Sequence, residues 1–392
     1  MTKSITAYTY EIDDIEAAVS GIISQLEPLN RSKNMIGIVT CSYDYIESGI
    51  IAALNEALPF EIIGETTVSQ TVHGEAGLLL LTMLVLYSDD CRFVCDITDE
   101  LPDPGDMKPI ITKSYEQTSA HLGEKPKLIL IFPPLLNTQA GDSYVNILSA
   151  LSERTPIFGS LCADDTTDTY VNAYTIYRGE AYKNRMTYVM IAGDINPEFR
   201  IASVSGESRL PYKGEITGSN GNLLTGINDV STVNYLETIG LAGNGKIRSG
   251  INSIPFLINF ENEAGADNVS VARVMFTTTP ENYAVCGGEM PIGASITAGI
   301  CDKDDVVSTT KQMIEDIGKN YKGKTALLFS CIGRRYALAL EPLLEAQIAA
   351  DEMSGDISFL FSYSSGEFCP TSVSEGGATN RFHNYTFVAC IF

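Results

Sequence analysis

The sequence predicts a mixed α/β protein, with α/β and α+β character, in which one supersecondary unit is repeated. Two observations carry this prediction. Apolar runs of strand length alternate with amphipathic stretches of helical length. In addition, the order strand, helix, second strand, loop and final strand occurs three times. Such tandem units favour layered mixed sheets with helices packed on them.

The elements follow this order along the chain. An opening amphipathic helix spans residues 12–26, with Asp13 and Asp14 in its first turn. The first unit then has strands at 35–40, 60–63 and 78–87 and a helix at 46–58. The second has strands at 128–132, 156–158, 171–177 and 186–192 and a helix at 144–151. The third has strands at 325–330, 357–361 and 385–392, with a helix after the first.

The domain organisation follows from the segment that lies between the second and third repeated units. Residues 199–302 carry dense turn signals and are expected to be mostly β. We therefore predict one domain over 1–196 and a second over 197–392, the latter divided into a β-rich part, 197–302, and an α/β unit, 303–392. In each copy a glycine closes the second strand, at Gly64, Gly159 and Gly366. Glycine there tolerates positive φ and close approach of a ligand, although for Gly64 alone a tight turn is the simpler interpretation.

Composition excludes several classes of function. The 392 residues carry a formal charge of −23 and no Lys/Arg cluster, so neither nucleic acid nor an acidic membrane surface is an expected partner. The longest apolar run is about half the ~20 residues that a membrane helix needs. The N-terminus lacks the apolar segment of a secretory signal, so we expect a cytoplasmic protein. Nine unpaired-looking cysteines and three scattered histidines predict reduced thiols and no zinc site.

The candidate site lies in the third unit. Polar side chains follow its strands at the ends where open α/β sheets bind ligands. The predicted ligand-binding residues are Cys331, Arg334, Glu341, Gly366, Glu367, His383 and Asn384. We expect these groups to meet in one hollow, with the Arg334 guanidinium matching an anionic group.

Each candidate has an alternative interpretation. Arg334 could instead form an internal salt bridge to Glu341 or Glu367, whereas Arg335 should point into solvent. Glu345 fits a solvated helix carboxylate better than Glu341 does. A helix N-terminus and Arg334 would favour the Cys331 thiolate.

Two catalytic or cofactor roles also stay open. Cys331, His383 and Glu367 have the residue types of a nucleophile, base and orienter, as in a cysteine-dependent hydrolase or transferase. His383 or His73 could ligate haem, while His121 should be exposed. Asn384 could instead hold a turn by a hydrogen bond from its side chain to the backbone.

The motifs, taken in order, resemble the FIST family, whose sensory module joins an N-terminal and a C-terminal FIST domain. The likeness covers nearly the whole chain. It rests on Ile62-Ile63-Gly64, Pro156-Ile157-Phe158-Gly159, Ala163-Asp164, Phe329-Ser330-Cys331-Ile332-Gly333-Arg334, Glu341, Gly366-Glu367 and His383-Asn384-Tyr385-Thr386. One departure is Ser160, where the family often has a second glycine.

The resemblance implies an intracellular small-ligand sensor and not an enzyme. Amino acids have been proposed as ligands for the family, and some members look like haem-dependent nitric-oxide sensors. No kinase, cyclase or methyl-accepting segment follows Phe392 in this sequence. We therefore expect the signal to leave through a partner protein of the kinase, cyclase or chemotaxis type.

Overall fold

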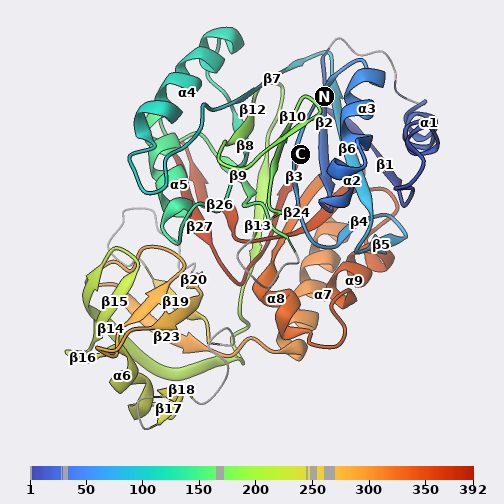
Figure 1. Cartoon of the computed structure of the whole chain (residues 1–392). Helices are drawn as coiled ribbons and strands as arrows, with labels where there is room; N and C mark the ends of the chain where they lie inside the picture. Colours follow the sequence, from blue (N-terminus) through green and yellow to red (C-terminus); the bar gives the residue numbers. More distant parts are fainter. Residues whose placement is uncertain are drawn as a thin grey trace.

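Three α/β units form the body of the protein, and a β-rich lobe projects from it (Figure 1). The computed structural model describes residues 2–27, 29, 34–164, 172–243, 246–247, 254–259 and 270–392. The predicted mixed α/β fold with repeated units is confirmed. The predicted boundary near 196 falls between the last strand of the second unit and the first strand of the third, and the domain limits stay a prediction.

Each unit contributes four strands in the same spatial order. In unit one these are β1 (Lys3–Thr9), β6 (Leu81–Ser88), β2 (Asn34–Cys41) and β3 (Glu61–Thr66). In unit two they are β7 (Cys91–Ile97), β12 (Thr187–Gly193), β8 (Leu128–Phe132) and β9 (Ile157–Ser160). In unit three they are β13 (Glu198–Ala202), β28 (Phe387–Ile391), β24 (Thr325–Cys331) and β25 (Ser358–Ser364). The last two strands of each set pair in parallel, and the others pair antiparallel.

The three units exchange hairpins in a cycle. Unit one sends β4 (Gln70–Val72) and β5 (Glu75–Gly77) to β25 of unit three. Unit two sends β10 (Thr175–Tyr177) and β11 (Glu180–Tyr182) to β3 of unit one. Unit three sends β26 (Glu367–Ser374) and β27 (Gly377–His383) to β9 of unit two. Each resulting sheet has six strands, and no unit completes its sheet alone.

The inner faces of the three sheets meet in one apolar core. Ile38, Leu130 and Phe329 represent the three units in it, and all are inaccessible to solvent. Helices cover the outer faces (Figure 1), so the strands are buried on both sides and read as continuous apolar runs. The helices are α1 (Ile15–Leu26), α2 (Asp44–Glu47) and α3 (Ile50–Ala57) in unit one, α4 (Lys108–Leu122) and α5 (Ala140–Leu151) in unit two, and α7 (Lys303–Asn320), α8 (Ile332–Ala337) and α9 (Leu344–Glu352) in unit three.

The lobe is an insertion between β13 and α7 with an apolar core of its own. Its eight-stranded sheet contains β14 (Arg209–Asn220), β15 (Leu223–Ile227), β16 (Val230–Ser231), β19 (Phe256–Asn259), β20 (Val271–Arg273), β21 (Met275–Thr278), β22 (Ala284–Cys286) and β23 (Ser295–Gly299). Beside it lie α6 (Thr232–Thr238) and the strand pair β17 (Ala242–Gly243) and β18 (Lys246–Ile247). The mostly β character expected for this segment is thus observed.

Two of the three recurrent glycines occupy equivalent places. Gly64 and Gly159 lie inside β3 and β9 at φ +156° and +150°. A Cβ there would come within 1.8 Å of the Val39 carbonyl oxygen and 1.9 Å of that of Ile131. Gly64 is therefore a strand glycine and not a simple turn. Gly366 differs, because it follows β25 and faces the Phe382 ring.

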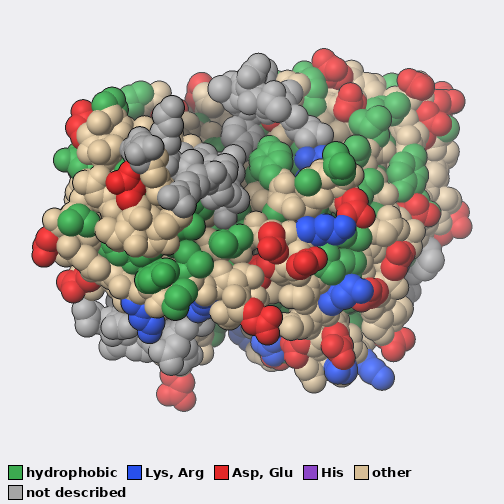
Figure 2. Space-filling view, turned by 90° about the horizontal axis from the view of Figure 1, so that it is seen from below, with side chains coloured by type: hydrophobic (Ala, Val, Ile, Leu, Met, Phe, Trp, Pro, Cys, Tyr) green, Lys and Arg blue, Asp and Glu red, His purple; other side chains and the backbone are tan. Residues whose placement is uncertain are grey.

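The surface matches the acidic composition. Lys and Arg side chains lie among more numerous acidic ones on the face shown in Figure 2. None of the helices in the described part of the chain has the length and apolar character needed to cross a lipid bilayer.

Candidate functional site

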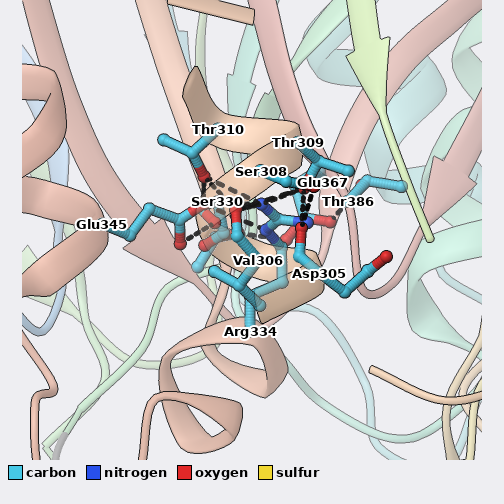
Figure 3. Close-up of polar contacts among 11 residues, drawn as sticks. Asp305, Val306, Ser308, Thr309, Thr310, Ser330, Arg334, Glu345, Glu367 and Thr386 are labelled. Atoms are coloured by element: carbon cyan, nitrogen blue, oxygen red, sulfur yellow. Dashed lines mark hydrogen bonds and ion pairs between the residues drawn. The ribbon is translucent and has the colours of Figure 1, made fainter. Parts of the chain in front are cut away.

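Arg334, on the short helix α8, is fully buried against Glu345 of α9 (Figure 3). Its Nε and Nη2 donate to Glu345 Oε1 at 3.0 and 2.8 Å. Nη2 also donates to the hydroxyls of Thr309 and Thr310 on α7 at 3.1 and 3.0 Å. Ser330 Oγ donates to the second Glu345 oxygen at 2.8 Å. These five residues are called the Arg334 cluster below.

One guanidinium nitrogen of this cluster lacks a hydrogen-bond partner among the described residues. Arg334 Nη1 is buried and has no hydrogen-bond partner among the described residues. An unmade hydrogen bond of a buried donor costs about 1–3 kcal/mol, and more for a charged group. The cluster therefore has a buried donor that no described residue satisfies.

The structure corrects three expectations about neighbouring charges. The partner of Arg334 is Glu345, which is 0% exposed and not solvated. Glu341 is at the surface, where it pairs with Lys303. Arg335 is buried and not in solvent. The cause is local: α8 ends at Ala337, and the turn that follows carries Glu341 outward.

Glu367, at the start of β26, lies near the Arg334 cluster (Figure 3). Its two oxygens are hydrogen-bonded to Ser364 Oγ and Thr386 Oγ1, both at 2.6 Å. Burial raises the pKa of Glu367 to about 8, although the two hydroxyls and the Arg334 charge act in the opposite direction. At neutral pH the carboxyl is therefore mainly protonated, which suits it to donate a hydrogen bond and not to hold an ammonium group.

Cys331 is the last residue of β24, and its thiol does not behave as expected. Burial raises its pKa far above the ordinary value, and the nearby Glu367 carboxylate adds to this, against opposing backbone contacts from Gly333 and Tyr385. The expected thiolate is thus wrong for the folded state, because desolvation outweighs the helix N-terminus and the guanidinium.

His383 stands opposite Glu367 in the ladder between β26 and β27. Its Nε2 bonds the carbonyl oxygen of Cys369 at 2.9 Å. Burial lowers the pKa of His383 to about 3, so the ring is neutral at physiological pH. The neighbouring Asn384 accepts from the backbone N–H of Val274 at 3.2 Å, which ties the body to the lobe.

The predicted residues are therefore partly brought together. Glu367 acts electrostatically on Cys331, Arg334 acts on Glu367, and His383 is the ladder partner of Glu367. Glu341 lies apart from them. A pocket of about 690 Å³ adjoins this region between α7 and the chain that follows β13. Thr309 lines this pocket and also bonds Arg334, whereas none of the predicted site residues lines it.

Comparison with known proteins decides the family. A model of the FIST N domain matches residues 35–230, and a model of the FIST C domain matches residues 234–370. The chain belongs to the FIST family. No curated protein sequence matches it. Among solved structures it is similar to cyanuric acid hydrolase from A. caulinodans, at 10% identity and TM-score 0.38, covering 100% of this chain and 99% of that one. A likeness of that size carries no argument about chemistry.

Haem does not fit the histidines of this FIST chain. His383 is wholly buried with Nε2 bonded to a backbone carbonyl. His73 has its Nε2 at the Ile357 carbonyl oxygen and its ring edge-on to Phe359. Neither ring lines the pocket beside α7. His121 is exposed as expected.

Ser160, the departure from the usual FIST pattern, has a structural role. Its hydroxyl bonds the Glu65 carboxyl at 2.5 Å across the junction of units one and two. Burial raises the pKa of Glu65 well above its ordinary value, while the Ser160 and Cys162 contacts lower it. The hydroxyl at 160 therefore helps to hold a second buried carboxyl that the sequence did not single out.

Sequence reasoning also missed the polar residues that surround Arg334. Glu345, Thr309, Thr310 and Ser330 were each compatible with an ordinary helix or strand. A signal was present in the adjacent threonines, since threonine is unfavourable inside a helix unless its hydroxyl has a local or tertiary partner.

Proposed function

We propose that this FIST chain is a small-ligand sensor in signal transduction whose ligand binds in the pocket beside the Arg334 cluster. FIST domains are sensory domains for small ligands, and this chain carries both in tandem. The ligand class is a small polar or zwitterionic metabolite such as an amino acid. The observation that carries the proposal is the buried Arg334 Nη1, which has no partner among the described residues, together with Thr309, which bonds the same guanidinium group and lines the pocket.

The anionic end of the ligand would complete the Arg334 cluster. A carboxylate that enters past Thr309 meets the one guanidinium nitrogen without a partner, and the planar fork of arginine matches carboxylate geometry. Arg200 lines the same pocket, but Asp316 and the Tyr321 hydroxyl already accept hydrogen bonds from it.

The cationic end needs a different carboxylate from the ones that the sequence favoured. Glu367 is mainly protonated and Glu341 is remote from the cluster. Glu207 lines the pocket and is exposed, so it is the carboxylate that we assign to an ammonium group.

The pocket also offers a route for the signal. Its wall includes Ser205, whose backbone N–H donates to Asp305 at the start of α7 at 2.9 Å. From there the chain runs directly into β14 of the lobe. A ligand between this segment and α7 would shift the lobe, and a partner protein of the kinase, cyclase or chemotaxis type would detect the shift.

Calorimetric titration tests the assignment. The purified chain is titrated with panels of amino acids and organic acids, and each hit is repeated with Arg334→Lys and Lys319→Ala. Lysine keeps a positive charge beside Glu345 but lacks the spare donor, so we expect at least about tenfold weaker binding. Lys319 is exposed on α7, away from the pocket lining, and paired with Glu315, so its variant should bind normally.

A parallel Arg200→Lys variant separates the two guanidinium groups. If a hit binds equally well to wild type and Arg334→Lys but weakly to Arg200→Lys, the anion contact lies at the surface and the Arg334 assignment is wrong. Thermal unfolding of each variant shows whether the protein titrated was folded.

A further inference from the structure

A second pocket, of about 350 Å³, lies in unit one at the end of β2. It is formed where the chain leaves β2, where it crosses from β3 to β4, and where it leaves β9. The side chains that matter for its chemistry are Ser42, Asp44, Ser69, Leu78, Leu79 and Asp164. None of them belongs to the Arg334 cluster or to the pocket beside it, so the two sites are independent.

The charge of this pocket has one sign. Asp44 and Asp164 line it, and the described residues that line it include no Lys, Arg or His. Asp164 is only 6% exposed. One of its oxygens accepts from the backbone N–H of Asn172 at 2.6 Å. Two carboxylates in a partly enclosed site repel anions and favour a cation.

The pocket also contains hydroxyls that lack hydrogen bonds. Ser69 is 0% exposed, and its Oγ has no partner within the part of the chain that the structure describes. The Oγ of Ser42 is also buried and also has no partner among the described residues. Because buried polar atoms are normally hydrogen-bonded, two hydroxyls without a partner among the described residues indicate a polar ligand, and each can accept a hydrogen bond from an N–H group.

Part of the remaining wall is apolar. Val68 is buried beneath the pocket, and Leu78 and Leu79 are 42% and 52% exposed at its edge. These aliphatic side chains offer no ligand atoms to a metal ion. No group of three or more His, Cys, Asp or Glu suited to a metal occurs among the described residues. The volume is at the lower end of the range for small-molecule pockets, which suits a ligand of a few carbon atoms.

We propose that this pocket binds a small organic ammonium ion, with the charged nitrogen between Asp44 and Asp164, N–H donors directed to Ser42 and Ser69, and a short alkyl chain against Leu78 and Leu79. The protein would thus have a cation site in its FIST N region that is separate from the ligand site proposed near Arg334.

The test uses three probes of the same shape. n-Butylammonium, n-butanol and butyrate are titrated into the full chain by calorimetry or ligand-observed NMR. Only butylammonium should bind saturably. Asp164→Asn keeps the acceptor for Asn172 and removes the charge, so binding should weaken about tenfold or more. Ser69 has φ +64°, which glycine adopts without cost, so Ser69→Gly removes the hydroxyl alone and should weaken binding severalfold.

Asp351→Asn is the matched control, because Asp351 is an exposed carboxylate on α9. Its variant should bind butylammonium as wild type does. Absence of saturable butylammonium binding to the folded wild-type chain overturns the proposal. So does equal binding of butanol or butyrate, or an affinity that is the same in wild type and Asp164→Asn.

Discussion

Removing one member of the buried Arg334–Glu345 pair should cost more stability than removing both. Both side chains are 0% exposed, so neither charge can be solvated when its partner is lost. The informative variants are Arg334→Met, Glu345→Gln and the double variant. Methionine and glutamine keep the approximate volume, so the comparison isolates the charges from the packing.

The magnitude follows from the contacts that remain. Each single variant leaves an uncompensated buried charge, for which the typical cost is about 3–5 kcal/mol. In the double variant no charge remains. The hydroxyls of Thr309 and Thr310 still donate to the carbonyls of Asp305 and Val306, both at 2.7 Å. The loss should then be about 1–3 kcal/mol, roughly one unmade hydrogen bond. The coupling between the two positions is therefore at least about 3 kcal/mol.

Urea unfolding at pH 7 measures these differences. The chain has no tryptophan, so circular dichroism is the suitable signal. Hydrogen exchange over α8 and α9 shows whether the loss is local to unit three, since a body with a lobe need not unfold in one step. Single variants that each lose less than about 1 kcal/mol would refute the reasoning, as would a double variant whose loss equals the sum of the singles.

Three further predictions concern other buried groups. The folded pKa of Glu367, about 8, lies above its ordinary value of 4.5, so the folded state binds the extra proton and stability should fall as pH rises between these values. Urea unfolding at pH 5 and pH 7.5 should show a loss of about 3 kcal/mol in wild type that Glu367→Gln lacks; parallel pH profiles would contradict this. Cys331 should react with iodoacetamide no faster than the other eight cysteines, because burial and Glu367 raise its thiol pKa; mass spectrometry after brief labelling at pH 7.5 would expose a faster Cys331. Asp142→Asn should leave the buried Arg273 uncompensated and loosen the lobe, which limited proteolysis would detect as faster cleavage than in wild type.

The repeated units could be predicted because they depend on local pattern. Strands such as β8 and β24 are buried on both faces, so they appear as unbroken apolar runs. The short hairpin strands β4 and β5 were missed, because Gln70–Val72 and Glu75–Gly77 are polar and only three residues long. The exchange of hairpins could not be predicted either, because no local sequence signal specifies which sheet an edge strand joins.

For the candidate site too, some features could be predicted from the sequence and others could not. Residue types at strand ends identified the region around Cys331 and Glu367, because position along a strand is a local property. Their protonation states were not predictable, since they depend on desolvation by segments far away in sequence. Glu345 was assigned to solvent for a related reason. Its burial requires α7 and α9 to pack together, and that contact brings Thr310 within 2.7 Å of its carboxylate.

Two of the buried arginines, Arg334 and Arg273, lie on the route that the proposed signal would take. Arg334 joins α8 to α7 and α9 within unit three. Arg273, on β20 of the lobe, pairs with Asp142 of unit two at 3.0 Å and donates to the Phe382 carbonyl at 2.7 Å. The lobe is thus fixed to the body at one end by an ion pair and at the other by the Ser205–Asp305 contact beside the proposed ligand pocket. Because an ion pair this deeply buried is costly to break, a ligand that displaces the Ser205 end should turn the lobe about the Arg273 end and not release it.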